Sequence, residues 1–150
     1  MLGEIMLKLL QGKLPRIDVQ TQLPPELSEF QQSLDSAFQR ILALKPDFDG
    51  EQSSSYEKAP VERAIIFLKK LALSVWQLNQ TVIPYPLIFP GPEGSIDIQW
   101  KTKKFQLLIN FPKDIEEPAS YYGDDYGKNT TEGLFDGTKL DQIFLFWLLD

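Results

Sequence analysis

Apolar side chains in the first half of the chain recur every three or four residues, the spacing that places them on one face of an α-helix. This pattern predicts a helix at residues 2–10, a second from the Pro24-Pro25 pair to just before Pro46, and a third over about residues 61–80. The third helix has the widest apolar stripe, so we expect it to contact neighbours on two sides at the centre of the core. Its stripe consists of Val61, Ala64, Ile65, Leu68, Leu71, Ala72, Val75 and Trp76.

Alternation of apolar and polar residues replaces this periodicity in the second half of the chain. Residues 83–94 hold four prolines, which exclude a helix and predict an extended connector that ends in a turn. Strict alternation predicts strands at residues 96–100 and 105–111. Weaker strand patterns cover residues 119–122 and 130–135.

These elements predict an α+β fold, in which N-terminal helices pack on one face of a small antiparallel β-meander and a short C-terminal helix follows. A chain of 150 residues has the size of one domain. We divide it into a helical part at 1–82, the meander at 83–137 and a terminal helix at 138–150. Thr138 and Asp141 resemble a capping box that begins this last helix.

Cysteine and histidine are both absent from the chain, whose net charge is −6. Their absence excludes thiol nucleophiles, histidine-based triads, disulfides and the common zinc sites, and we expect no cofactor and no metal. The excess of acid lies mainly in residues 114–136. Direct nucleic-acid binding is therefore disfavoured, because phosphate recognition depends on cations. The same charge favours a basic protein partner, and solubility alone is the other interpretation.

The N-terminus lacks the features of a secretory signal, since Glu4 interrupts it and no basic leader precedes its apolar residues. The longest apolar run covers seven residues, Ile143 to Leu149, which is far too short to span a membrane. We therefore expect a cytoplasmic protein with no membrane partner, in an oligomeric state that the pattern does not fix.

Paired carboxylates are the chemistry most open to a catalytic interpretation. The tetrapeptide Tyr122-Gly123-Asp124-Asp125 matches the one that polymerases use to place two aspartates on metal ions. The same residues are ordinary turn formers, and we favour that explanation because a polymerase needs a much longer chain. With Asp136, the two aspartates leave a metal-dependent nuclease as an alternative.

Aromatic side chains outside the regular periodic elements are the stronger functional signal. Tyrosine in a loop buries a large area against a protein partner at low entropic cost. Five aromatic residues lie in proline- or glycine-rich segments: Tyr85, Phe89, Tyr121, Tyr122 and Tyr126. We expect partner contacts at Tyr121, Tyr122, Asp124, Asp125 and Tyr126. In the competing interpretation the tyrosines cap the open end of the sheet.

The C-terminal half also shows an order of motifs that resembles a known group of proteins. These motifs are Pro84-x-Pro86, Pro90-x-Pro92-x-Gly94, Ile96-x-Ile98-x-Trp100, Leu107-x-Ile109, Glu132-Gly133 and Trp147-Leu148. The order is similar to that of a loosely defined group of small, mostly uncharacterised bacterial proteins, some suspected of antitoxin or defence-operon roles. The chain departs from the group in its single Gly94, where a glycine pair is usual, and in Gln99, where an acid is common.

The function that the sequence favours is that of a non-enzymatic protein-binding module, an antitoxin-like or regulatory partner of a basic protein. Two alternatives stay open. One is a carboxylate- or metal-dependent enzyme such as a nuclease. The other is a structural subunit of a larger complex, in which the apolar faces of helices 61–80 and 140–149 would be exposed in the monomer.

Overall fold

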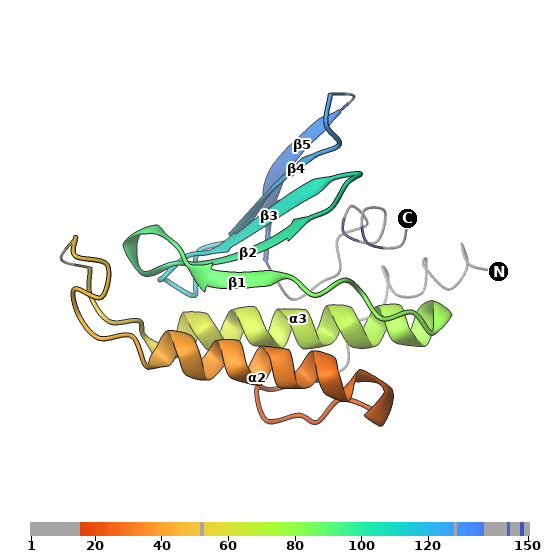
Figure 1. Ribbon diagram of the computed structural model, residues 1–150, viewed down its shortest axis with the longest axis horizontal. Helices are drawn as coiled ribbons and strands as arrows, with labels where there is room; N and C mark the ends of the chain where they lie inside the picture. Colours follow the sequence, from red (N-terminus) through yellow and green to blue (C-terminus); the bar gives the residue numbers. More distant parts are fainter. Residues whose placement is uncertain (1–15, 52, 128, 137–143, 145–147, 149–150) are drawn as a thin grey trace.

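A computed structural model describes residues 16–51, 53–127, 129–136, 144 and 148 (Figure 1). Two helices and five strands are present in this part of the chain. The elements are α2 (Ser28–Leu42), α3 (Lys58–Asn79), β1 (Leu87–Pro90), β2 (Ile96–Lys101), β3 (Gln106–Phe111), β4 (Ala119–Asp124) and β5 (Thr130–Phe135). The α+β class is confirmed. The expected helix at 2–10 lies outside the described residues, as does most of the terminal helix at 138–150.

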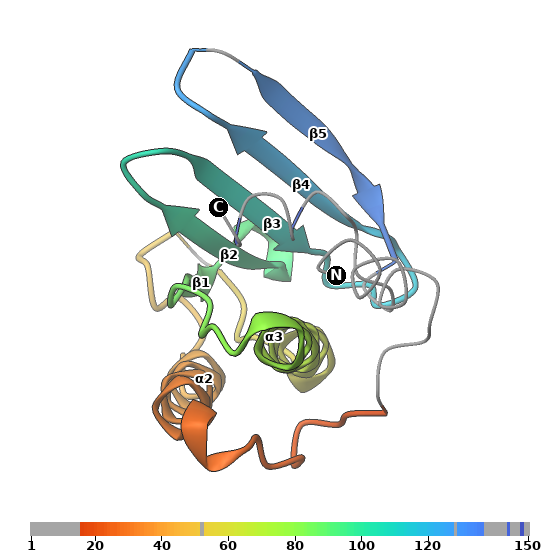
Figure 2. The same ribbon diagram turned by 90° about the vertical axis from the view of Figure 1, so that its right-hand side faces the viewer.

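The five strands form one antiparallel sheet in the order β1-β2-β3-β4-β5, so each strand pairs with the next one along the chain. This is the expected meander. Both helices lie on one face of the sheet (Figure 2). There, α2 packs under β1 and α3 packs under β2 and β3, whereas the β4–β5 hairpin projects beyond the helices.

One strand was not foreseen. Within the segment expected to be only a connector, β1 pairs with β2 in a register that places Ile88 opposite Ile98 and Pro90 opposite Ile96. Proline has no N–H, but a strand at the edge of a sheet needs partners on one side only, so a proline is tolerated there. The proline content therefore excluded an α-helix correctly, leaving only a 3₁₀ turn at Pro92–Gly94, but concealed an edge strand.

The helices follow the expected pattern, with small shifts at their ends. A 3₁₀ turn at Pro25–Leu27 precedes α2, and α3 begins at Lys58 rather than near residue 61. Gln80, with φ of 55°, ends α3 in the left-handed conformation. As expected, α3 has neighbours on two sides, because it contacts α2 as well as β2 and β3.

The core lies between the helices and the side of the sheet that faces them. Its sheet side comes from the alternate residues of β2 and β3, including Ile98, Trp100 and Ile109, all of which are buried. Trp100 satisfies its ring N–H by donating a hydrogen bond of 2.7 Å to the carbonyl of Pro84. Phe144 and Leu148 are also buried in this core.

A charged side chain in the middle of α3 is buried in this apolar setting. Lys69 is 1% exposed, and its Nζ donates hydrogen bonds of 2.7 and 2.8 Å to the carbonyls of Val19 and Thr21. We refer to residues 16–23 as the N-terminal strap. The strap is also held by α2, where Gln31 Oε1 accepts a hydrogen bond from the N–H of Leu23. Lys69 thus fastens the strap to the central helix.

None of the helices in the described part of the chain is long and apolar enough to cross a membrane.

Candidate interaction surface

The side of the sheet that faces away from α2 and α3 is the candidate interaction surface, and we call it the outer face. It is formed by the strand residues that alternate with the buried ones. Two of its leucines are among the most exposed large apolar residues described, Leu87 at 63% and Leu134 at 68%, and Tyr122 is 39% exposed. The outer face comprises Leu87, Phe89, Asp97, Gln99, Lys101, Gln106, Leu108, Asn110, Ser120, Tyr122, Asp124, Thr130, Glu132 and Leu134.

An open hollow of about 530 Å³ lies on this face across β3, β4 and β5. Tyr122 stands between Leu108 on β3 and Glu132 on β5, which are its cross-strand partners. The exposed Leu134 lines the same hollow. The hollow therefore combines an aromatic ring and two leucines with one carboxylate, a composition suited to an apolar side chain accompanied by a cation.

The expected contact residues Tyr121 and Tyr122 point to opposite faces of β4. Tyr121 faces the helix side and is partly buried, with its ring centroid 6.1 Å from that of Phe135 and 5.4 Å from that of Phe144. Tyr122 belongs to the outer face. The structure thus places Tyr121 against the core and leaves Tyr122 as the accessible member of the pair.

The two aspartates shape the turn between β4 and β5. Asp124 Oδ1 accepts a hydrogen bond of 2.8 Å from the N–H of Tyr126. Asp125 Oδ1 accepts a hydrogen bond of 2.6 Å from the N–H of Asn129. The carbonyl of Asn129 accepts a second hydrogen bond, of 3.1 Å, from the N–H of Asp125. This is the turn chemistry that the sequence favoured over a metal site.

Tyr126 lies at the tip of the same turn with φ of 65°, and it is 47% exposed. Its hydroxyl lies 2.7 Å from the carbonyl oxygen of Thr102 and 3.1 Å from that of Phe105, within donating distance of both. Both carbonyls belong to the turn between β2 and β3. Tyr126 therefore links the two turns at this end of the sheet, while nearly half of the residue remains exposed.

The carboxylates of the nuclease alternative are not brought together. Asp136 directly follows β5, whose last residue, Phe135, pairs with Ala119, whereas Asp124 pairs with Thr130 at the other end of the strand. The five residue steps from Thr130 to Phe135 separate the two ends by about 17 Å. Among the residues that the structure describes, no three acidic, histidine or cysteine side chains are grouped so that they could hold a metal ion.

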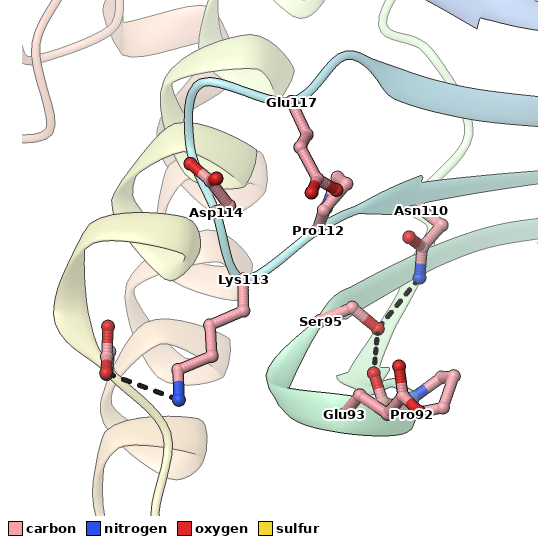
Figure 3. Close-up of a pocket in the computed structure, with 9 residues that line it drawn as sticks. Pro92, Glu93, Ser95, Asn110, Pro112, Lys113, Asp114 and Glu117 are labelled. Atoms are coloured by element: carbon pink, nitrogen blue, oxygen red, sulfur yellow. Dashed lines mark hydrogen bonds and ion pairs between the residues drawn. The ribbon is translucent and has the colours of Figure 1, made fainter.

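A polar cleft of about 600 Å³ lies at the opposite end of the sheet from the β4–β5 turn, between the β1–β2 and β3–β4 loops (Figure 3). At its centre Asn110 Nδ2 donates to Ser95 Oγ at 2.9 Å and to Asp97 Oδ1 at 2.8 Å. Ser95 Oγ donates to the carbonyl of Pro92 at 2.6 Å. These bonds use both amide hydrogens of Asn110 and fix the β1–β2 loop on the sheet.

Carboxylates surround this cleft, but one of them is already paired. Lys113 Nζ lies 3.5 Å from Glu57 Oε1 across its rim, and the carboxylates of Glu93, Asp114 and Glu117 also line it. Sequence reasoning missed the polar centre of the cleft. Asp97 and Asn110 occupy polar positions of neighbouring strands, so their cross-strand pairing was the signal that could have revealed it.

Tyr56 contacts the β1–β2 loop beside this cleft. Its hydroxyl donates a hydrogen bond of 2.6 Å to the carbonyl of Gly91. Burial raises the pKa of Tyr56, and the negative charges of Asp49 and Asp97 raise it further. The phenol therefore stays protonated and serves as a hydrogen-bond donor to the β1–β2 loop.

Comparison with known proteins gives no relative to this chain: no protein family, no curated protein and no solved structure matches it.

Proposed function

We propose that this chain is a non-enzymatic module that binds a basic protein and regulates it, in the manner of an antitoxin. The outer face is the observation that carries the proposal. Three large apolar side chains, Leu87, Tyr122 and Leu134, are exposed there on a sheet whose other face is packed against helices. Tyr122 and Leu134 line the same hollow, and a contiguous exposed apolar patch with polar surroundings marks a surface that recognises another protein.

The charge of the chain supports a basic partner. The chain has 21 acidic and 15 basic residues, and Glu132 lies directly beside Tyr122 in the β4–β5 ladder. Opposite charge accelerates the encounter of two proteins, and apolar contact then slows their separation. The antitoxin-like role rests on the motif order of the C-terminal half, and binding itself rests on the outer face.

The alternatives have less support. A structural subunit was suggested by the apolar faces of helices 61–80 and 140–149. In the described structure, α3 buries its stripe against α2 and the sheet except for the half-buried Trp76, and most of the second helix lies outside the described residues. A carboxylate enzyme was suggested by Asp124, Asp125 and Asp136, which lie at two ends of one hairpin.

Photo-crosslinking in cells tests the proposal. A benzophenone amino acid replaces Tyr122 on the outer face in one variant and Ile115 in the other. Ile115 is more accessible, at 50% exposure against 39% for Tyr122, but lies in the β3–β4 loop. We expect the probe at position 122 to give one dominant adduct with a basic protein, and the probe at 115 to give none. Absence of an adduct at position 122, or identical adducts from both positions, would contradict the proposal.

A further inference from the structure

We infer that the partner binds to the edge of β5, where an extended basic segment pairs with this strand and becomes the sixth strand of the sheet. This inference rests on the proposed function and specifies how the partner is bound. The argument depends on how the two edges of the sheet differ, on the side chains that β5 presents, and on the sign of its charge.

The edge at β1 is protected against further pairing. Pro86 precedes this strand and Pro90 ends it, so two backbone positions have no N–H to donate. In addition, Arg40 of α2 donates a hydrogen bond of 2.7 Å to the carbonyl of Ile88 in the middle of the strand. Missing donors and an occupied acceptor make β1 a poor template for another strand.

The edge at β5 has none of these protections. Its sequence, Thr-Thr-Glu-Gly-Leu-Phe, contains no proline and no lysine, and it pairs with β4 over six consecutive residues without a bulge. Among the strands of the described residues it is the last in the order of the sheet, and none of its residues is buried. A regular, accessible edge strand of this kind is a template for strand addition.

The side chains of β5 indicate what an added strand should carry. On the outer face β5 presents the carboxylate of Glu132 and, two residues later, the apolar side chain of Leu134. Cross-strand neighbours on one face of a sheet stabilise each other when they are oppositely charged or both apolar. A segment with a lysine or arginine beside Glu132 and an apolar residue beside Leu134 fits this pattern.

Charge also distinguishes a foreign segment from a second copy of this chain. Pairing β5 with β5 of another copy would bring two Glu132 carboxylates onto one short seam. Like charges across a strand pair are unfavourable, whereas a basic segment replaces this repulsion by attraction. The acidic edge therefore favours a basic partner.

Peptide titration of the full-length, isotopically labelled chain tests the inference. The probe is a capped eight-residue peptide of alternating lysine and valine. One control peptide replaces lysine by glutamate, and a second keeps the lysines but is N-methylated at alternate amides, which preserves charge and blocks strand pairing. We expect amide shifts and slowed hydrogen exchange in residues 130–135 with the first peptide only.

Matched variants of the chain separate local recognition from net charge. Glu132→Lys should weaken binding of the lysine–valine peptide about fivefold or more, because one attractive pair becomes repulsive. Glu116→Lys makes the same change in net charge at an exposed position in the β3–β4 loop and should leave binding within about twofold. NMR spectra of both variants confirm that they are folded.

In the peptide titration, the inference would be overturned by no response in residues 130–135, or by a glutamate or N-methylated peptide that binds as tightly as the lysine–valine peptide. It would also be overturned if Glu132→Lys and Glu116→Lys changed peptide affinity equally, or if the chain formed concentration-dependent dimers that pair through β5. Its failure can be told apart from failure of the proposed function. If the peptide does not bind but the probe at position 122 still captures a basic partner, docking at β5 is wrong and the binding module stands. If both experiments fail, the proposed function falls as well.

Discussion

The ring of Tyr121 lies against Gly133, its partner across the β4–β5 ladder. A methyl group on Gly133 would come within 2.8 Å of Tyr121 Oη, closer than such atoms approach in proteins, and within 3.0 Å of its Cζ, which is a tight contact. The rings of Phe135 and Phe144 also pack against the ring of Tyr121. Because α3 packs chiefly under β2 and β3, this aromatic cluster adds side-chain contacts with the core to the β3–β4 pairing that holds the projecting hairpin.

Gly133→Ala should therefore lower the free energy of unfolding by about 1–3 kcal/mol, the usual cost of forcing extra volume into a packed site. Urea denaturation followed by fluorescence measures the change. The double variant Tyr121→Phe/Gly133→Ala serves as the control, since removal of Oη takes away the closest contact. Part of the lost stability should return in the double variant, and strictly additive effects would mean that the ring does not cause the loss.

The buried Lys69 gives a second prediction. Lys69→Met keeps an unbranched apolar side chain but removes the ammonium group, which leaves the carbonyls of Val19 and Thr21 without their donor and should cost about 2–4 kcal/mol. The N-terminal strap should also loosen, so that trypsin cleaves faster after Arg16. Lys70→Met, at the neighbouring and more exposed position, should change both measurements little. Equal effects of the two substitutions would show that the hydrogen bonds to the strap contribute nothing.

The pH dependence of stability follows from the same side chain. Burial lowers the pKa of Lys69, and the charges of Asp35 and Asp18 oppose this only in part. The pH window lies between the pKa of Lys69 in the folded chain and its ordinary value near 10.5. In this window the unfolded chain binds more protons than the folded one, so the stability contributed by Lys69 rises with pH. Below the window that contribution is constant. The stability difference between wild type and Lys69→Met should grow as pH rises toward about 10. Denaturation at a series of pH values measures it, and a constant or shrinking difference would contradict the sign.

These features show where sequence reasoning succeeds and where it stops. Strict alternation fixed the inward faces of β2 and β3, so the buried position of Trp100 was predictable. Tyr121 and Tyr122 are adjacent, and only the pairing of β4 with β3 decides which of them faces the core. That register is a long-range property. Lys69 was hidden for a related reason, because its partners are backbone carbonyls of a segment about fifty residues away.

Tyr126→Phe tests the structural role of the Tyr126 hydroxyl at the β4–β5 turn. The substitution keeps the exposed ring but removes the hydroxyl that donates to the carbonyl of Thr102. Loss of one hydrogen bond of this kind should cost about 0.5–1.5 kcal/mol and should speed amide exchange in the turn. Hydrogen exchange read by NMR measures both effects. Unchanged exchange would mean that the link between the two turns does not stabilise them.

Alanine at the two neighbouring tyrosines should give opposite results, because their side chains lie on opposite faces of β4. Tyr121→Ala removes a ring from the aromatic cluster and should lower the free energy of unfolding by about 2–4 kcal/mol. Tyr122→Ala removes an exposed ring and should change stability by less than about 0.5 kcal/mol.

If the outer face binds the partner, Tyr122→Ala alone should lower affinity, by about tenfold or more for a central aromatic contact. Affinity can be measured by calorimetry once the crosslinked partner is purified. A Tyr122→Ala protein that binds as well as wild type would place the contact away from the hollow, whereas a destabilised Tyr122→Ala would mean that this ring supports the sheet rather than a partner.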